Sequence, residues 1–456
     1  MNTIKLPIDF ENRMKAMLQD EYDAYIASFN DPASKAVHLN TNICSADRLL
    51  KDFGDDFELL PYSDNGFISH VEKIGSHPLH HAGVLYSQDP GALMPVCSIP
   101  YEFTDKDIVL DMCAAPGGKS SQLAIILEKA GAHLVSNEIN KSRNTILRSN
   151  MERMGYRNQL ITNMDSEEIA ASFPGVFSFI LVDAPCSGEG MFRKYPESID
   201  EWSVSNVEMC SQRQKEILDN VLKALRPGGY LLYSTCTYSR EENEDIIHYL
   251  LDNYDLELVP LRDRIMNYST ALGNEPGAHF FPHLAYGEGQ YMCLLHSTNA
   301  RSEDVSNYSY REYTPSLPKA GKNIVKIIKE AINQDFIDTL NLYIDKDNIY
   351  SIDPYPYMLP RKSISRLGVY MGTIIKNRFE PSHLFFKIYG SKLSNVIDLS
   401  SNTDMAIKYL KGEELYFENA PKGYGAFSYY GGILGGFKSA GGRLKNHYPK
   451  GLRNNN

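Results

Sequence analysis

Short apolar runs alternate with amphipathic, helix-period segments between residues 107 and 297. This alternation is typical of a parallel sheet whose two faces are covered by helices. The last run is placed to return as an antiparallel strand. The pattern therefore predicts an open, doubly wound α/β sheet, in which ligands bind at the carboxyl ends of the strands. The predicted strands are 108–112, 133–138, 160–164, 177–183, 230–235 and 290–297.

Three helices are predicted between strands of this set. The first is capped by Ser120 and Ser121 and presents apolar residues at i, i+3, i+4 and i+7. The second covers 141–154 and stops at Gly155, and the third ends at the breaker sequence 226–229. The apolar positions that define the first and third helices are Leu123, Ile126, Leu127, Ala130, Ile217, Leu218, Val221, Leu222 and Leu225.

The segments outside this core differ from it in composition. Residues 1–100 combine a helical start, 10–29, with short alternating runs, which predicts a small α+β module. Residues 299–319 are rich in Ser, Asn, Tyr and Pro and predict a linker. A helix is predicted over 324–340, and the Gly- and Tyr-rich remainder predicts a β-dominated module. The predicted domains are 1–100, 101–300, 301–390 and 391–456.

Composition narrows the class of protein. The chain has 456 residues, 43% hydrophobic and 23% charged, which is ordinary for a globular protein. No apolar run is long enough to span a membrane, and the N-terminus lacks the apolar core of a secretory signal. The seven cysteines are scattered without a Cys-x-x-Cys pair, which predicts reduced thiols, a cytoplasmic location and no metal site.

The charge is distributed unevenly along the chain. The net charge is −11, but residues 301–456 hold 22 Lys and Arg against 15 Asp and Glu, a net +7, which leaves −18 for residues 1–300. A solvated basic tail is one interpretation, and contact with RNA phosphates is the other. Clustering on one module favours RNA contact. The cluster consists of Lys438, Arg443, Lys445, His447, Lys450 and Arg453.

The first strand runs directly into a turn of small residues, DMCAAPGGKS at 111–120. Small residues at a strand-to-helix turn let a ligand approach the backbone, and the helix start presents free amide groups. The turn is not a P-loop, because the glycine five positions upstream of Gly118 is missing, and it is not Gly-x-Gly-x-x-Gly. The turn therefore predicts a cofactor site without identifying a dinucleotide or a triphosphate.

Asp111 lies at the end of the first predicted strand, and two further acids lie at the ends of the next two. Glu138 closes the second strand and could hold both ribose hydroxyls of a nucleoside. Asp165 follows the third and could accept a hydrogen bond from an adenine amino group. Either acid alone is more often a solvated loop carboxylate, but acids at the carboxyl ends of successive strands favour a cofactor site.

Two cysteines also follow core strands, Cys186 in Asp-Ala-Pro-Cys and Cys236 in Ser-Thr-Cys. A lone cysteine is usually an inert small hydrophobe, but two at one edge of a sheet suggest chemistry. A thiolate that adds to carbon 6 of cytosine makes carbon 5 nucleophilic enough to accept a methyl group. Asp183 could stabilise the charge that develops near ring nitrogen 3. This chemistry leaves open which cysteine is the nucleophile.

With these motifs, the sequence resembles the Sun-type RNA 5-methylcytosine methyltransferases. It is most similar to the RsmF group, which acts on bacterial small-subunit ribosomal RNA. The core resemblance lies in DMCAAPGGKSSQL, NEINKSR, DAPCSGEGMFRK and RPGGYLLYSTCTYSREENE. The flanks LPIDFENRMKAMLQDEYDAY, HHAGVLYSQDPGALMP, IKNRFEPSHLFF and GGRLKNHYPKGLR are also similar to that group.

The resemblance implies a class I (Rossmann-like) methyltransferase core that uses S-adenosylmethionine. It also implies an N-terminal RNA-recognition-like module and a PUA-like C-terminal module. It makes Cys236 the nucleophile and Cys186 the residue that helps to release the RNA adduct. It implies cofactor contacts from Cys113, Ala114, Ala115, Pro116, Gly117, Gly118, Lys119, Glu138, Asp165 and Asp183.

The expected substrate is 16S ribosomal RNA or the small ribosomal subunit, and a monomer is expected. Transfer RNA as the substrate is one alternative, and a non-catalytic ribosome-assembly factor is another. An amino-group methyltransferase is disfavoured, because Asp-Ala-Pro-Cys stands where that class has Asn/Asp-Pro-Pro-Tyr/Phe.

Overall fold

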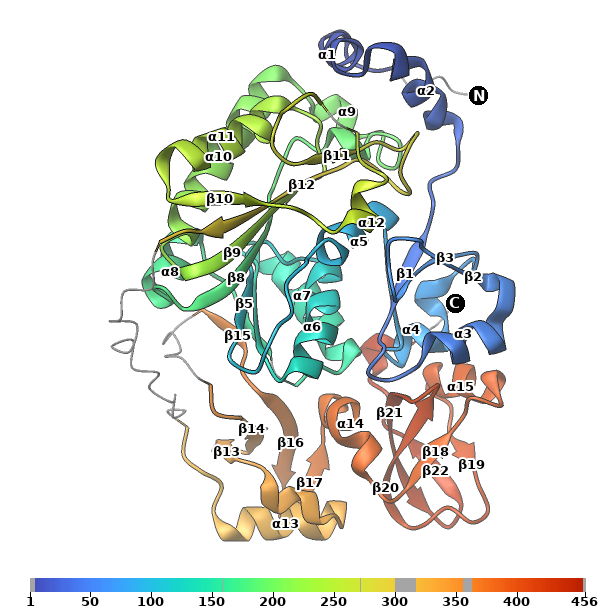
Figure 1. Ribbon diagram of the computed structural model, residues 1–456. Helices are drawn as coiled ribbons and strands as arrows, with labels where there is room; N and C mark the ends of the chain where they lie inside the picture. The colour runs from blue at the N-terminus through green and yellow to red at the C-terminus, as the bar shows by residue number, and fades with distance from the viewer. Residues whose placement is uncertain (1–4, 158, 271, 300–316, 356–362, 454–456) are drawn as a thin grey trace.

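A nine-stranded sheet forms the centre of the molecule (Figure 1). The computed structural model describes residues 5–157, 159–270, 272–299, 317–355 and 363–453. The strand order is β10-β12-β9-β8-β5-β6-β7-β15, and β11 pairs with β12. The strands are β5 (Ile108–Asp111), β6 (His133–Asn137), β7 (Gln159–Thr162), β8 (Phe177–Asp183), β9 (Leu225–Thr235), β10 (Leu256–Val259), β11 (Ala278–Phe280), β12 (Gln290–Ser297) and β15 (Ile364–Arg366).

The predicted doubly wound α/β core is confirmed. β7, β6, β5, β8 and β9 are parallel, and β12 returns antiparallel to β9. Successive residues of each buried strand face opposite layers, so Val109 packs with α6 and α7 while Leu110 packs with α8, α10 and α11. The helices are α6 (Gly118–Ala130), α7 (Lys141–Met154), α8 (Ser166–Ser172), α9 (Ser198–Glu201), α10 (Val204–Val221), α11 (Glu244–Asn253) and α12 (Asp263–Met266).

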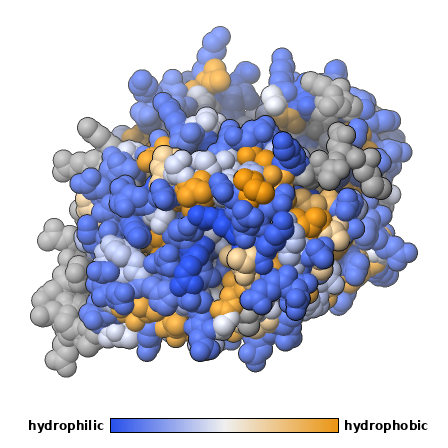
Figure 2. All heavy atoms as spheres, turned by 90° about the horizontal axis from the view of Figure 1, so that it is seen from above, coloured by the Kyte–Doolittle hydropathy of each residue, from blue (hydrophilic) through white to orange (hydrophobic). Residues whose placement is uncertain are grey.

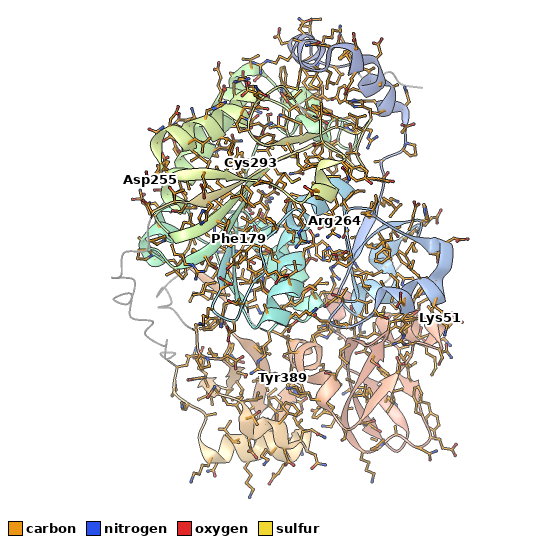
Figure 3. All side chains as sticks on the ribbon, in the orientation of Figure 1. Lys51, Phe179, Asp255, Arg264, Cys293 and Tyr389 are labelled. Carbon is orange, nitrogen blue, oxygen red and sulfur yellow. The ribbon has the colours of Figure 1, made fainter. Side chains whose placement is uncertain are left out.

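Residues on both faces of the sheet are excluded from solvent. Phe179 on β8 is fully buried in one layer, and Cys293 on β12 is buried in the other (Figure 3). This two-sided burial requires the continuous apolar runs seen in the sequence. Seen from above, the outer surface is mostly hydrophilic, with apolar residues in separate groups (Figure 2).

The predicted cap of the first core helix is wrong. α6 begins one turn earlier, with Gly117 as its N-cap residue. Ser120 and Ser121 lie inside the first turn and are buried. The Ser120 hydroxyl donates to Asp111 over 2.6 Å, and the Ser121 hydroxyl lies 2.8 Å from the His38 ring. Both serines therefore bind neighbouring elements instead of the free amides of their own helix.

Three further helix predictions differ from the structure. Ile126, predicted on the buried face of α6, is 39% exposed, although the predicted positions Leu123 and Leu127 are buried between the sheet and the N-terminal module. α10 ends at Val221, and Leu225 is already the first residue of β9. The helix predicted over 324–340 ends at Ile332, because Asn333 adopts a left-handed conformation with φ of +55°.

The N-terminal region has its own four-stranded sheet, ordered β2-β3-β1-β4. Its first helical segment, predicted over 10–29, is interrupted at Gln19, whose φ is +47°. This segment packs against the central α/β core, where the Phe10 and Phe192 rings lie 5.0 Å apart. The elements are α1 (Ile8–Leu18), α2 (Tyr22–Ala27), β1 (Ala36–Leu39), α3 (Ala46–Phe53), β2 (Phe57–Leu59), β3 (Gly66–Ser69), α4 (Pro78–His81), β4 (Leu85–Gln88) and α5 (Pro90–Cys97).

Two smaller sheets follow the core along the chain, ordered β13-β14-β16-β17 and β18-β20-β21-β22-β19. The second shares an apolar core with the N-terminal module (Figure 1). The elements are α13 (Lys322–Ile332), β13 (Leu342–Asp345), β14 (Asn348–Ser351), β16 (Val369–Ile375), β17 (Arg378–Pro381), α14 (His383–Tyr389), β18 (Val396–Asp398), α15 (Thr403–Leu410), β19 (Leu415–Tyr416), β20 (Gly423–Tyr429), β21 (Gly432–Ala440) and β22 (Arg443–Asn446).

One short strand crosses between these units. β15 leaves the C-terminal half and pairs antiparallel with β7 at the edge of the central sheet. Arg366 is buried there and donates to the carbonyl of Tyr156 over 2.5 Å. The four predicted domain ranges stay predictions, and most of the predicted linker, 300–316, lies outside the described residues. Within the described part of the chain, no helix is long and apolar enough to cross a membrane.

Candidate active site

The predicted cofactor turn lies at the carboxyl end of β5, where the chain enters α6. Gly117 has a φ of +115°, in the region that favours glycine. No side chain of the described residues caps α6, so its first amides are free to bind a ligand. The turn is held from outside: Arg143 donates to the Ala115 carbonyl over 2.8 Å, and Asn150 to that of Pro116 over 2.9 Å.

Four acids follow the ends of neighbouring strands. The order β8-β5-β6-β7 places Asp183, Asp111, Glu138 and Asp165 in a row along one edge of the sheet. Asp111 is fully buried, and burial raises its pKa to about 7. Such a row suits an elongated ligand that lies across the strand ends.

Glu138 and Asp165, the acids predicted to hold the ribose and the adenine, differ in burial. Glu138 is only 3% exposed and accepts a hydrogen bond from the Asn140 amide over 2.8 Å. Arg143 lies 3.8 Å from its other oxygen. Asp165 is exposed and caps α8 by accepting from the Glu168 amide over 2.8 Å. The structure thus gives Asp165 a structural partner, whereas Glu138 is held in a fixed position at the strand end.

Asp183 joins the cofactor turn to the cysteine region. Lys119 donates to one of its oxygens over 2.7 Å, and Ser234 to the other over 2.8 Å. Burial lowers the pKa of Lys119, but the attraction of Asp183 outweighs this effect and the pKa is raised overall. The negative charge of a Cys236 thiolate also raises the pKa of Lys119, so the two charges attract each other.

The two predicted cysteines meet. β8 and β9 are adjacent and parallel, with Asp183 paired to Ser234, so the loops that follow them emerge side by side. The Sγ atoms of Cys186 and Cys236 are 3.3 Å apart. The hydrogen bond to Cys236, together with burial, raises the pKa of Cys186 well above its usual range. Cys186 therefore keeps its proton at neutral pH.

The third cysteine of the site, Cys113, differs from this pair. It follows β5 in the cofactor turn, and burial raises the pKa of its thiol. Within the described residues, no group of three or more His, Cys, Asp or Glu side chains is arranged to hold a metal ion. By its position in the sequence, Cys113 is part of the predicted cofactor turn.

Two buried carboxylates that the sequence analysis did not assign fix the cysteine loops. Glu242 accepts from the Ser187 amide over 3.0 Å, and its other oxygen accepts from the Ser187 hydroxyl. Glu189 accepts from the Tyr238 amide over 2.9 Å and from the Ser239 hydroxyl over 2.6 Å. Each carboxylate ties one cysteine loop to the other. Their positions beside the cysteine motifs were the only signal in the sequence.

A cavity of about 340 Å³, here called the site cavity, separates the cofactor turn from β4 of the N-terminal module. Lys119 and Asp183 lie in its wall. Because residues of the N-terminal module line this cavity, the module forms part of the candidate site. The other lining residues are Ser34, Lys35, Tyr86, Ser87, Gln88, Asp89, Ala92, Asp111, Cys113, Ala114, Ala115, Pro116, Gly118, Lys194 and Tyr195.

Four family models match successive parts of the chain. Residues 99–296 match "16S rRNA methyltransferase RsmB/F", and 6–90 match the N-terminal domain of RsmF. Residues 328–386 match the first C-terminal domain of RsmF, and 394–454 match the RsmF PUA domain. Together with the Rossmann-like sheet, these matches define an RNA methyltransferase. More particularly, the chain belongs to the RsmB/F methyltransferase family.

Known relatives extend over the whole chain. The chain is 29% identical to ribosomal RNA small subunit methyltransferase F of Aliivibrio fischeri over 94% of this chain and 93% of that protein. It is 28% identical to the protein of the same name from Vibrio vulnificus over 99% and 98%. These values confirm the family that the sequence motifs predict.

Solved structures support the same fold. A methyltransferase homologue from Pyrococcus horikoshii has a TM-score of 0.56 and 27% identity, and the match covers 64% of this chain and 96% of that one. NSun6 from the same organism has a TM-score of 0.56 at 20% identity, which shows the shared fold alone. The roles of the individual site residues stay predictions.

Proposed function

We propose that this protein transfers a methyl group from S-adenosylmethionine to carbon 5 of a cytosine in RNA, through a covalent bond between Cys236 and carbon 6. One observation carries the proposal: two cysteine sulfurs lie 3.3 Å apart, beside an acid that is paired with the lysine of the cofactor turn. Methylation of an exposed heteroatom would not require such a pair of thiols.

The residues present fit S-adenosylmethionine. Free amides at the start of α6 and the left-handed Gly117 leave room for close approach of a ligand to the backbone. The buried Glu138 carboxylate can accept from both ribose hydroxyls. One oxygen of Asp111, Oδ1, is buried without a partner among the described residues and can accept from a donor on the ligand. When bound, S-adenosylmethionine supplies the methyl group.

The chain's own residues carry out the remaining steps. The Cys236 thiolate adds to carbon 6 of cytosine, and the electron pair released to the ring makes carbon 5 a nucleophile. The ring gains negative charge that an acid near nitrogen 3 stabilises by donating a proton, and Asp183 in its protonated form is the proposed donor. After methyl transfer, water takes the proton from carbon 5 and the electron pair of that C–H bond re-forms the double bond between carbons 5 and 6. The bond between Cys236 and carbon 6 breaks, its electron pair stays on Cys236 as a thiolate that Cys186 can protonate, and 5-methylcytosine is released.

The arrangement of the thiol pair is compatible with Cys236 as the nucleophile, the role that the family resemblance implies. The two sulfurs lie 3.3 Å apart, so the S–H of Cys186 can donate to a thiolate at Cys236. Lys119 lies close enough for its positive charge to attract that thiolate. Cys186 is then the proton carrier that assists elimination, in agreement with the release role that the family resemblance implies.

The proposed substrate is 16S ribosomal RNA. The Aliivibrio and Vibrio relatives, which match over nearly their whole length, are both named ribosomal RNA small subunit methyltransferases. The C-terminal module offers exposed lysines for phosphate contact, among them Lys445 and Lys450.

The proposal is tested by methylation of isolated small-subunit RNA, of small subunits and of transfer RNA, followed by bisulfite mapping. Wild-type protein should leave a 5-methylcytosine at one or a few positions, and Cys236→Ala should leave none while binding RNA equally well. Methylation by Cys236→Ala that is lost in Cys186→Ala would reverse the assignment of the nucleophile. Product on transfer RNA alone would overturn the ribosomal substrate.

A further inference from the structure

The mouth of the site cavity carries two lysines from different parts of the chain. Lys35 lies just before β1 of the N-terminal module and is exposed, and Lys194 lies on the loop that follows Cys186. The Lys194 side chain is 30% exposed, and its Nζ is 3.9 Å from a carboxylate oxygen of Asp89. Tyr195 beside it is 47% exposed. The mouth therefore presents two ammonium groups and one half-exposed aromatic ring, and the Lys194 ammonium lies 5.8 Å from the centroid of that ring.

The short turn that presents Lys194 and Tyr195 is held firmly. Phe192 is fully buried against Phe10. The Arg193 side chain, only 8% exposed, donates to both oxygens of Glu288 and to two backbone carbonyls. Because residues 192 and 193 are anchored inward, residues 194 and 195 are fixed at the cavity mouth before any ligand arrives.

A second hollow beside the cysteine loops is lined by more acidic than basic side chains. This larger hollow, about 830 Å³, lies between α1 and the loops that follow β9. Its acidic side chains outnumber its two arginines, Arg13 and Arg240. RNA phosphates are repelled by such a surface, so the lysine-bearing mouth is the favourable approach. The acids that line this hollow are Asp20, Glu21, Glu189, Glu241, Glu244, Asp245 and Glu275.

We propose that the cavity mouth is a clamp for the RNA backbone, a proposal that rests on the proposed function and deepens it. Lys35 and Lys194 neutralise phosphates next to the target nucleotide, and Tyr195 stacks on a neighbouring base. A cytosine that leaves its stack loses stacking energy, and an aromatic side chain with nearby cations can offset this loss. The N-terminal module thus helps to position the substrate.

The lysine contacts are tested by measuring the affinity of the full-length protein for a small-subunit RNA fragment over a range of salt concentrations. Each lost contact to a single strand lowers the slope of log affinity against log salt by about 0.7. Lys35→Gln/Lys194→Gln should therefore lower the slope by about 1.4 relative to wild type. Lys51→Gln, an exposed lysine at the outer edge of the same module (Figure 3), should leave it unchanged.

An unchanged slope in the double variant would overturn the clamp. So would a loss of S-adenosylmethionine affinity with an intact slope, because the lysines would then serve the cofactor. Lys35→Arg/Lys194→Arg should keep the slope of the wild type, and this variant guards against misfolding as the cause. If the wild type binds RNA with a lysine-dependent slope but forms no 5-methylcytosine, the clamp stands and the proposed function fails.

The stacking role of Tyr195 has a separate test. Tyr195→Ala should weaken RNA binding about five-fold or more, whereas Tyr195→Phe, which keeps the ring, should bind as the wild type does. Equal affinity of the alanine and phenylalanine variants would overturn the stacking contact. The affinity for S-adenosylmethionine should be the same in both.

Discussion

At the scale of single residues, the thiol pair depends on neighbours that hold it in place. Cys186 and Cys236 belong to different loops, and their contact is maintained by Glu189 and Glu242, which are buried and cross-link the loops. A buried carboxylate with several donors is costly to remove, because its partners are left without an acceptor. The site is therefore sensitive to residues that never touch the substrate.

The proton on Cys186 leads to the first prediction. In Cys186→Ala, elimination of Cys236 loses its proton carrier, so turnover should fall about 100-fold or more. The covalent complex should accumulate and appear as a slower band on a denaturing gel with labelled RNA. Cys186→Ala/Cys236→Ala should show no such band. Normal turnover of the single variant, without a trapped complex, would remove the release role.

The buried Glu242 carboxyl gives a prediction about pH. Burial raises its pKa from the usual 4.5 to about 7. Between these pH values the folded carboxyl holds a proton that the unfolded chain releases, so the unfolding free energy decreases as pH rises through this window. Glutamine does not titrate. In Glu242→Gln the unfolding free energy, measured by denaturant titration, should therefore fall by about 1–3 kcal/mol less than in the wild type between pH 4.5 and about 7. Asp111, shifted in the same direction, still titrates in this variant. Parallel pH profiles of variant and wild type would contradict the assignment.

At the scale of elements, the cofactor turn depends on one left-handed residue. A Cβ on Gly117 would lie 3.3 Å from Leu147, and the φ of +115° is unfavourable for any other residue. Gly117→Ala should therefore displace the free amides of α6 and weaken S-adenosylmethionine binding about tenfold, equivalent to about 1.4 kcal/mol by calorimetry.

The other end of the same helix provides a matched control. Gly131 has a φ of +75°, and its added Cβ would lie 3.4 Å from Asp105. Because both glycines are left-handed, Gly131→Ala should destabilise the fold about as much as Gly117→Ala does. It should leave the affinity for S-adenosylmethionine unchanged. An equal loss of affinity in both variants would mean that the effect comes from general destabilisation of α6.

The accuracy of the sequence-based predictions follows from how each element is buried. The β8 strand and α7 have the predicted limits, because a strand buried on both faces needs an unbroken apolar run and a left-handed Gly155 ends the helix. The sequence pattern predicts one buried face for α6, but the helix packs between two layers, and a local pattern does not show this arrangement. The same limit hid Glu189 and Glu242, since nothing local distinguishes a buried acid from a solvated one.

At the scale of the whole molecule, the uneven distribution of charge predicts which module makes RNA binding depend on salt concentration. Lys445 and Lys450 are exposed on the C-terminal module. Lys445→Gln/Lys450→Gln should weaken RNA binding and lower its salt dependence by up to about 1.8 if both contact duplex phosphates. Lys106→Gln/Lys129→Gln, a pair of exposed lysines on the catalytic core, should change neither. Equal slopes for the two double variants would show that the C-terminal lysines do not touch RNA.

β15 also bears on how the protein is made. The edge of the catalytic sheet at β7 is completed only by residues 364–366, about 200 positions later in the chain than β7 itself. During synthesis, a nascent chain that has emerged only as far as β12 exposes unpaired amides and carbonyls along β7, the kind of edge on which strands of other chains add. Translation must therefore proceed well into the C-terminal half before this edge of the central sheet is covered.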